Sequence, residues 1–372
     1  MKIPLSSPDI SEAEIAAVQA VLRTTRLSLG GKLEEFEQSL AAYAGTKHAV
    51  ALSSGTAALH LALLSAGISA GAEVIVPSFT FIAVANAVRY VGATPVFVDI
   101  DPQTLNMAPA AVAAAITPKS RAIMVVHTFG VPAALEELLA IARRHHLVMI
   151  EDACEALAGE YQGRKLGSFG NAGVFGFYPN KQITTGEGGA LVTDDAKVAA
   201  RAKMLRNQGR DSSEEWFSHQ EIGYNYRISE INCALGSAQL ARIAEILTAR
   251  ERVAQMYEAR LCNHVDLVLP PTQIASGKIS WFVYVVRLAE RFAGAGRDRI
   301  ATDLTARGIG CGRYFAPIHQ QPAYRNVPHR CMDLKVTESI AQRTLALPFF
   351  NQLAEKQVAE VCRVLREVMS NI

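Results

Sequence analysis

The stretch NAGVFGFYPNKQITTGEGGALVTDD, residues 171–195, decides the fold and contains the residue on which the chemistry depends. Two short β-rich runs, VFGFYP and GALVTDD, enclose Lys181 and the glycine loop Gly186–Gly189. Similar runs alternate with alanine- and leucine-rich stretches back to His48. This alternation is typical of βα units built around a mostly parallel, buried sheet.

Five further runs complete the set of predicted strands: HAVALSS, EVIVPS, TPVFVDID, RAIMVVHTFG and LVMIEDAC. Helices are predicted at Thr56–Ile68 and at Pro132–His146, the second with proline in its first turn. Seven strands imply a wide, mixed but mostly parallel sheet with helices on both faces. The predicted fold class is therefore α/β.

The length of 372 residues favours two domains, because single cores grow inefficiently beyond about 250–300 residues. We expect a large domain over residues 1–245 and a smaller α/β domain over residues 246–372, with residues 1–20 as a candidate for packing on the small domain. The charged stretch Arg242–Arg252 is the expected bridge. In the small domain, Ser280–Leu288 is the predicted strand and Glu355–Met369 the last helix.

Composition excludes several function classes. The net charge of +2 provides no general attraction to nucleic acid or anionic lipid. No stretch approaches 18 consecutive apolar residues, so no membrane span is expected. The six cysteines lack C-x-x-C spacing and the N-terminus MKIPLSSPDI does not resemble a signal sequence, which favours a reducing cytoplasm. No metal site is predicted.

Lys181 is the strongest candidate for chemistry. Most lysines are solvated surface groups, but this one follows aromatic and apolar residues, precedes permissive glycines, and has only Glu187 as a charge in the next twelve residues. A lysine in a cleft forms an imine with an aldehyde, and its amine then serves as a proton carrier. The nearby G-E-G-G is not the spaced dinucleotide fingerprint, and Gly30-Gly31-Lys32 lacks the rest of a P-loop.

A phosphate seat is predicted where the strand HAVALSS meets the following helix. Ser54, Gly55, Thr56 and Ala57 occupy that junction. Free N–H groups and the helix dipole attract an anion there, and glycine allows a close approach. An ordinary helix cap formed by Ser54 or Thr56 explains the same residues.

Asp152 follows the apolar run Leu147–Ile150 at the carboxyl end of a predicted parallel strand, the edge at which open α/β sheets bind ligands. A helix cap or a structural ion pair is the alternative. A buried carboxylate needs a cationic partner, and a protonated ring nitrogen would serve. A phosphate seat, a strand-end Asp and a loop Lys together match the needs of pyridoxal 5'-phosphate (PLP).

The motifs in this order resemble the DegT/DnrJ/StrS family of PLP-dependent sugar aminotransferases over nearly the whole chain, from Pro4 to Met369. They are SSGTAALHLAL, PSFTF, ATPVFVDID, EDACEALAGEYQGRKLGSFG, FYPNKQITTGEGGALVTDD, GYNYRISEINCALGSAQL and PIHQQPAY. The resemblance implies the aspartate-aminotransferase-like fold, fold type I of PLP enzymes. It also implies a homodimer with shared active sites.

The resemblance assigns roles to single residues. Lys181 becomes the internal-aldimine lysine, Asp152 the partner of the pyridine nitrogen, and Gly55, Thr56 and Ala57 the phosphate-binding turn. Phe81 matches the aromatic residue that stacks on the cofactor ring, although core packing also explains a phenylalanine.

Three more matches come from the second half of the chain. Arg227 matches the residue that reaches the phosphate of the neighbouring subunit, with Asn225 as the weaker competitor and an exposed, ion-paired arginine as the alternative. His319 matches a histidine near the sugar nucleotide, and a structural histidine is the alternative.

Two departures from the family pattern concern the cofactor contacts. Glu155 stands where many relatives have Gln or His near the 3-oxygen of the cofactor, a variant of perosamine-synthase-like members. Gly176 stands where many relatives have a phosphate-binding Ser. The hydroxyl contact is therefore absent.

The resemblance implies transfer of an amino group from L-glutamate, through pyridoxamine phosphate, to a nucleotide-linked keto-sugar, with a 4-keto-6-deoxy sugar aminated at C4 as the preferred acceptor. Amination of a keto-cyclitol is the alternative. Dehydratase-like relatives replace the lysine with histidine, so Lys181 argues against that activity. A regulatory or binding protein is the alternative from another class, but no DNA-binding segment supports it.

Overall fold

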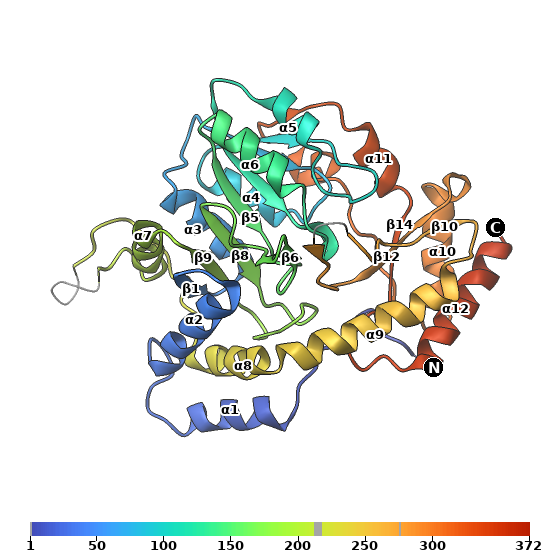
Figure 1. The fold of residues 1–372 in the computed structure, drawn as a ribbon, viewed down its shortest axis with the longest axis horizontal. Coiled ribbons are helices and arrows are strands. Elements are labelled where there is room, and N and C mark those ends of the chain that lie inside the picture. The colour runs from blue at the N-terminus through green and yellow to red at the C-terminus, as the bar shows by residue number, and fades with distance from the viewer. Residues whose placement is uncertain (1, 212–217, 275–276) are drawn as a thin grey trace.

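A sheet of eight strands forms the centre of the molecule (Figure 1). The computed structural model describes residues 2–211, 218–274 and 277–372. The strands of this sheet are β1 (His48–Leu52), β2 (Glu73–Pro77), β3 (Thr94–Val98), β4 (Ser120–Val126), β5 (Val148–Asp152), β8 (Ala172–Gly176), β9 (Gly189–Thr193) and β13 (Arg330–Cys331).

The strand order is β1-β9-β8-β5-β4-β2-β3-β13. The strands from β8 to β13 pair in parallel, whereas β9 runs antiparallel to both β8 and β1. The seven predicted strands and the mixed, mostly parallel sheet are confirmed. The eighth strand, β13, was not expected, because two residues carry no periodic signal.

Helices cover both faces of this sheet, and others surround the C-terminal sheet. They are α1 (Glu12–Leu22), α2 (Gly31–Ala44), α3 (Gly55–Ser65), α4 (Ala83–Tyr90), α5 (Pro109–Ala115), α6 (Leu135–Arg144), α7 (Ala196–Arg206), α8 (Glu230–Ala241), α9 (Ile243–Leu261), α10 (Ala295–Ala306), α11 (Lys335–Ala341) and α12 (Glu355–Ser370). Short 3₁₀ turns occur at η1 (Thr128–Gly130), η2 (Glu290–Phe292), η3 (Ile318–Gln320) and η4 (Pro322–Tyr324).

The two faces of the large sheet bury alternate residues of each strand. In β2, Val74 and Val76 pack in a cluster with residues of α3, α4 and α7. Ile75 packs on the opposite face with residues of α2, α5, α6 and α8. Period-two burial on both faces explains why the strands are continuous apolar runs.

A smaller antiparallel sheet, β10 (Leu267–Val268), β12 (Tyr284–Leu288) and β14 (Thr344–Leu347), packs with α9, α10 and α12 (Figure 1). Ile3 joins this core, while α1 packs along α8. A third sheet joins β11 (Gly277–Lys278) to β6 (Glu160–Tyr161) and β7 (Arg164–Lys165). The division of the chain at residue 245 stays a prediction.

Several element boundaries differ from the predictions, including that of α3, which ends at Ser65 and not at Ile68. α6 begins at Leu135, so Pro132 precedes the helix instead of opening it. The stretch Arg242–Arg252 begins at the residue between α8 and α9 and continues inside α9, which extends to Leu261. β12 begins at Tyr284, and the backbone N–H of Ser280, outside the strand, donates to the carbonyl of Gly130.

Within the described residues, no helix is both long enough and apolar enough to cross a membrane.

Candidate active site

A cleft with a volume of about 460 Å³ opens at the carboxyl ends of β4, β5 and β8. The first turn of α3 and the segment before α4 form one side, and residues from the C-terminal third complete it. The lining residues are Ser54, Gly55, Thr56, Leu59, Thr80, Phe81, Ala83, Val126, Asp152, Cys154, Glu155, Gly176, Phe177, Tyr178, Asn180, Lys181, Glu187, Gly188, Phe282, Tyr314 and Phe315. Lys181 and Asp152 thus share one cleft.

Lys181 lies in the loop between β8 and β9, with only 15% of its side chain exposed. Its backbone N–H donates to the carbonyl of Tyr178 at 2.9 Å. The ammonium nitrogen lies 3.9 Å from the ring centroid of Phe282 and 3.7 Å from Glu155 Oε1. The amine therefore sits between an aromatic face and a carboxylate, largely shielded from water.

Asp152 ends β5 and is buried against the cleft. Its Oδ1 accepts a hydrogen bond from the Cys154 N–H at 3.0 Å. The Cys154 thiol also interacts with this carboxylate, but among the described residues no cationic side chain pairs with it. A buried carboxylate that faces a cleft without a cationic partner is suited to receive a protonated ring nitrogen.

The neighbouring Glu151 points to the other face of the sheet and is fully occupied. It accepts hydrogen bonds from the N–H groups of Gly167, Phe169 and Gly170, at 2.9, 2.6 and 2.7 Å. His127 Nε2 lies 3.0 Å from its Oε2, and His127 Nδ1 accepts the Ala133 N–H. Nδ1 is therefore unprotonated and the imidazole neutral. Glu151 supports the loop structurally, so of these two neighbouring acids only Asp152 lines the cleft.

Glu155 is held by a strained turn. Its Oε2 accepts the Phe129 N–H at 2.9 Å, and its Oε1 faces Lys181. Burial raises the pKa of Glu155, although the Lys181 charge opposes that effect. Phe129 adopts a φ of 56°, a conformation that is unfavourable for a bulky side chain.

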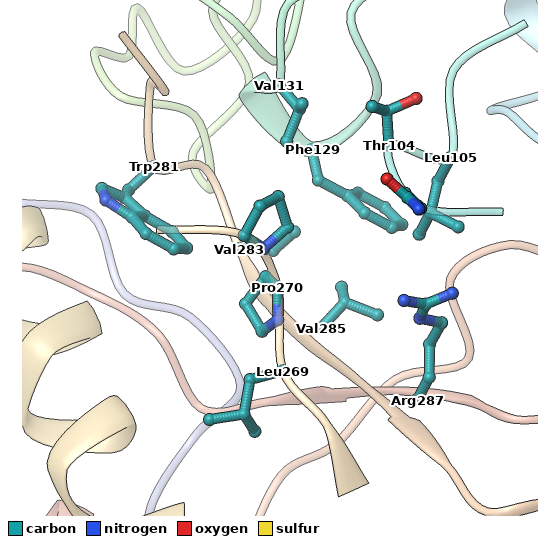
Figure 2. A pocket seen from close by; sticks show the side chains of 12 residues that line it. Thr104, Leu105, Phe129, Val131, Leu269, Pro270, Trp281, Val283, Val285 and Arg287 are labelled. Carbon is teal, nitrogen blue, oxygen red and sulfur yellow. The ribbon is translucent and has the colours of Figure 1, made fainter. Parts of the chain in front are cut away.

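The ring of Phe129 stabilises this turn. It lines a hollow of about 20 Å³ together with Leu105, Val283 and Val285 (Figure 2). The hollow is large enough for no more than a water-sized group, so its residues pack and do not bind a ligand. The packing fixes the N–H group that orients Glu155.

The first turn of α3 presents free donors to the cleft. Ser54 caps the helix by accepting the Ala57 N–H at 3.1 Å. The N–H groups of Gly55 and Thr56 meet no acceptor in the part of the chain that the structure describes. The helix is therefore capped by Ser54 and still has free N–H groups that can bind an anion. Ala57 uses its N–H for the cap and does not line the cleft.

Glycines bring β8, β9 and α3 together here. A Cβ on Gly189 would lie 2.4 Å from the backbone nitrogen of Gly55. A Cβ on Gly176 would lie 3.2 Å from Cys154 Sγ. The Cys154 sulfur therefore occupies the space beside Gly176, which is a physical reason for the missing serine.

The remaining predicted residues are dispersed. Phe81 lines the cleft but is 61% exposed. Arg227 donates to Asn207 Oδ1 at 3.0 Å, and Asn225 is exposed; neither lines the cleft of its own chain. The Nδ1 atom of His319 forms a hydrogen bond with Ser78 Oγ at 2.7 Å, and its Nε2 atom forms one with Glu338 Oε1 at 3.0 Å. The first contact places the histidine beside the Pro77–Phe81 segment.

Sequence reasoning missed the residues that the C-terminal third contributes. Phe282, Tyr314 and Phe315 line the cleft beside Lys181. Tyr314 stacks on Phe315 with ring centroids 5.1 Å apart. No local pattern marks residues that reach a site from more than 100 positions away. Cys154, two residues after Asp152, was within reach of the sequence argument.

The residues present fit PLP. The α3 N-terminus offers free N–H donors for a phosphate, Asp152 offers a carboxylate without a cationic partner for a ring nitrogen, and Lys181 offers an amine for the aldehyde. When bound, PLP supplies an electron sink that makes transfer of an amino group feasible. The protein supplies binding, orientation and proton transfer.

Comparison with known proteins supports the same interpretation. The family model described as "DegT/DnrJ/EryC1/StrS aminotransferase family" matches residues 8–366. GDP-perosamine synthase from Caulobacter vibrioides is 42% identical over 370 residues, covering 99% of this chain and 98% of that protein.

Two solved structures have the same fold. The crystal structure of S. venezuelae DesV in complex with a ketimine intermediate is 36% identical in sequence with a TM-score of 0.91, covering 100% of this chain and 99% of that one. The PLP form of the sugar aminotransferase Spr1654 from Streptococcus pneumoniae is 27% identical with a TM-score of 0.95, covering 100% of this chain and 99% of that one. The PLP-dependent aminotransferase fold expected from the sequence is thereby confirmed. The chain belongs to the DegT/DnrJ/EryC1/StrS aminotransferase family and is an aminotransferase.

Proposed function

We propose that this aminotransferase moves an amino group from L-glutamate to a nucleotide-linked 4-keto-6-deoxy sugar at C4, with PLP held on Lys181. The observation that carries the proposal is the placement of Lys181 and Asp152 in one cleft, above the open N-terminus of α3. The 42% identity to GDP-perosamine synthase makes a GDP-linked keto-sugar the first acceptor to test.

Each residue of the cleft has a defined task in this proposal. The Lys181 amine binds the cofactor aldehyde and afterwards carries a proton between the reacting carbon atoms. Asp152 keeps the ring nitrogen protonated through its carboxylate. Glu155, whose pKa burial raises, accepts and returns a proton at the Lys181 amine, 3.7 Å away. Gly55 and Thr56 hold the phosphate through their N–H groups.

A two-stage assay tests this function. The purified protein with PLP should show a visible absorption band. L-glutamate alone should change this band as the first half-reaction proceeds. Lys181→Ala should abolish both the band and its response to L-glutamate. Lys165→Ala is the matched control, because Lys165 pairs with Glu160 outside the cleft and should leave both signals unchanged.

The acceptor is identified by the product. Protein loaded through L-glutamate is mixed with a GDP-linked 4-keto-6-deoxy sugar or with a keto-inositol, and the aminated product is found by mass spectrometry. Transfer to the nucleotide sugar supports the proposal. Transfer to the cyclitol alone would show that the acceptor is a keto-cyclitol and not a nucleotide sugar. A colourless protein that PLP cannot reconstitute would favour a non-enzymatic role.

We further propose that the working form is a homodimer in the cytoplasm, with Arg227 of each subunit completing the site of the other. Phe81 and Tyr178, 61% and 54% exposed, leave the cleft of one chain open, and Arg227 does not reach that cleft. All six cysteines are free thiols, as suits a reducing compartment.

Complementation tests the shared site. Lys181→Ala and Arg227→Ala are each expected to be nearly inactive alone. Co-expressed at equal levels, they should form mixed dimers with one intact site, restoring about a quarter of the activity of the unmodified protein. Failure to recover activity in verified mixed dimers would contradict the role of Arg227 across the interface.

A further inference from the structure

Arg250 is a buried cation in the middle of α9, only 3% exposed. Its Nη2 donates to the carbonyl of Lys181 at 2.8 Å, and its Nη1 donates to the carbonyl of Phe282 at 3.0 Å. No carboxylate of the described chain lies within ion-pair distance of it. Burial lowers the pKa of Arg250 to about 10, so the guanidinium is still charged at neutral pH. A buried charge that is held by carbonyl groups and the ring of Phe349, without a carboxylate partner, is costly and calls for an explanation.

The two carbonyl groups belong to two residues whose side chains meet. The Lys181 ammonium nitrogen lies 3.9 Å from the Phe282 ring centroid. One planar guanidinium therefore ties the backbone of the cofactor lysine to the backbone of the aromatic residue that covers it. The rigid fork of arginine can hold two acceptors at a fixed separation, which a lysine cannot do.

The next residue strengthens the same connection from the other side. Gln182 Nε2 donates to the carbonyl of Glu155 at 2.7 Å and to Ser280 Oγ at 2.8 Å. Ser280 Oγ in turn donates to the carbonyl of Leu157. Two successive residues of the lysine loop, Lys181 and Gln182, are thus linked to the segment that enters β12. Of these two links, the one through Arg250 carries a charge.

We propose that Arg250 is a positioning residue that holds the Lys181 and Phe282 backbones in one fixed geometry, so that the lysine amine meets the cofactor and the transferred proton at the right place. The inference rests on the proposed function of Lys181. It predicts that losing the fork displaces the Lys181 nitrogen from the Phe282 ring and alters the protonation equilibrium of that nitrogen in the cofactor linkage, which the aromatic face influences. A displacement of this kind lowers the reaction rate more than it weakens substrate binding.

The test compares Arg250→Met and Arg250→Lys with the unmodified protein, all loaded with PLP. The first readout is the visible absorption of the bound cofactor as a function of pH, measured well below the thermal midpoint of each variant. The other titratable groups that line the cleft around the Lys181 nitrogen are Glu155, Asp152, Cys154, Tyr178, Glu187 and Tyr314, and all are retained in the variants. A change in the profile therefore reports the surroundings of the Lys181 nitrogen.

We expect Arg250→Met to shift the apparent pKa of the absorption band by about 0.5 unit or more. We also expect it to lower kcat for the glutamate half-reaction by about tenfold, with KM changed less than about twofold. Arg250→Lys keeps the charge but binds one carbonyl at a time. Its apparent pKa and kcat should lie between those of Arg250→Met and the unmodified protein. Arg252→Met is the matched control: this arginine lies on the same helix and donates to the carbonyl of Asn351 instead. It should behave like the unmodified protein.

The outcomes separate the two proposals. An Arg250→Met protein that keeps both the pH profile and kcat within twofold would overturn the inference while leaving the proposed function intact. If Arg250→Met does not fold, Arg250→Lys decides the matter in the same way, and an unchanged profile would overturn the inference. If the unmodified protein itself shows no cofactor band, the proposed function fails and the inference fails with it.

Discussion

Two helices of the large sheet layer, α2 and α3, both begin with glycine, but different groups face their first turns. At α2 the carboxylate of Glu230 accepts the N–H groups of Gly30 and Leu33 through Oε1, at 2.9 and 3.1 Å, and that of Lys32 through Oε2 at 2.8 Å. At α3 the N–H groups of Gly55 and Thr56 face the cleft. The first helix has an anion built into the chain, whereas the second is open to an anion from outside.

The difference teaches that a glycine at a helix start does not by itself indicate a ligand. Gly30-Gly31-Lys32 has the composition of a phosphate loop, yet its donors are used by Glu230, which is buried at the start of α8. What distinguishes α3 is the surrounding structure. The strand β9 approaches its first turn so closely that only glycine fits at position 189.

The largest effect should come from Gly189→Ala. The new Cβ would lie 2.4 Å from both the Gly55 nitrogen and the Ser54 carbonyl carbon, so the backbone must move. We expect a loss of about 3 kcal/mol in the free energy of unfolding, and a decrease of about tenfold or more in PLP affinity. Chemical unfolding and cofactor titration measure the two effects.

Gly31→Ala is the control at the corresponding end of α2. Its Cβ would meet nothing within 4 Å, and its φ is not positive. This variant should keep the affinity for PLP and gain up to about 1 kcal/mol in stability, because alanine favours a helix more than glycine does. Equal effects of the two substitutions would contradict the proposed difference between the helix ends.

A smaller effect is expected from Glu230→Gln, which removes the internal anion of α2. An amide retains one acceptor oxygen for three N–H groups, so we expect a loss of about 2 kcal/mol in unfolding free energy, with PLP affinity unchanged within about twofold. Glu34→Gln, an exposed substitution in the first turn of α2, should change stability by less than about 0.5 kcal/mol. A loss of cofactor affinity in Glu230→Gln would show that the two helix ends are not independent.

The smallest effect concerns α1, whose first turn is closed by Ser11 and Glu14. Burial raises the pKa of Glu14, but hydrogen bonds from Ser11, Gln239 and Arg242 outweigh it and lower the pKa from 4.5 to about 2. A lowered pKa means that the charged form stabilises the fold above pH 4.5, and that this stability is lost as the pH falls toward 2.

Glu14→Gln should therefore lower the unfolding free energy at pH 7 by about 1 kcal/mol. The difference from the unmodified protein should shrink as the pH decreases from 4.5 to 2. Thermal unfolding at several pH values measures this trend, with the exposed Glu12→Gln as control. A difference that grows in acid would contradict the assignment.

The sequence was most informative where the signal is local. The seven main strands follow from β-rich apolar runs, and the position of Lys181 between two of them follows from the same pattern. β13 escaped prediction because two residues pair with β3 only in the tertiary structure. Phe282 and Tyr314 escaped for the same reason, since they reach the cleft from the C-terminal third. The roles of Arg227 and His319 stay predictions, because neither lines the cleft of its own chain.

The covalent position of the cofactor tests the central claim most directly. The protein is loaded with PLP, reduced with borohydride, digested, and searched for the pyridoxyl mass on every lysine-containing peptide. We predict that the mass is found on Lys181 and that Lys181→Ala removes it while Lys165→Ala does not. A pyridoxyl group on another lysine, or none on a protein that folds and retains PLP, would contradict the account.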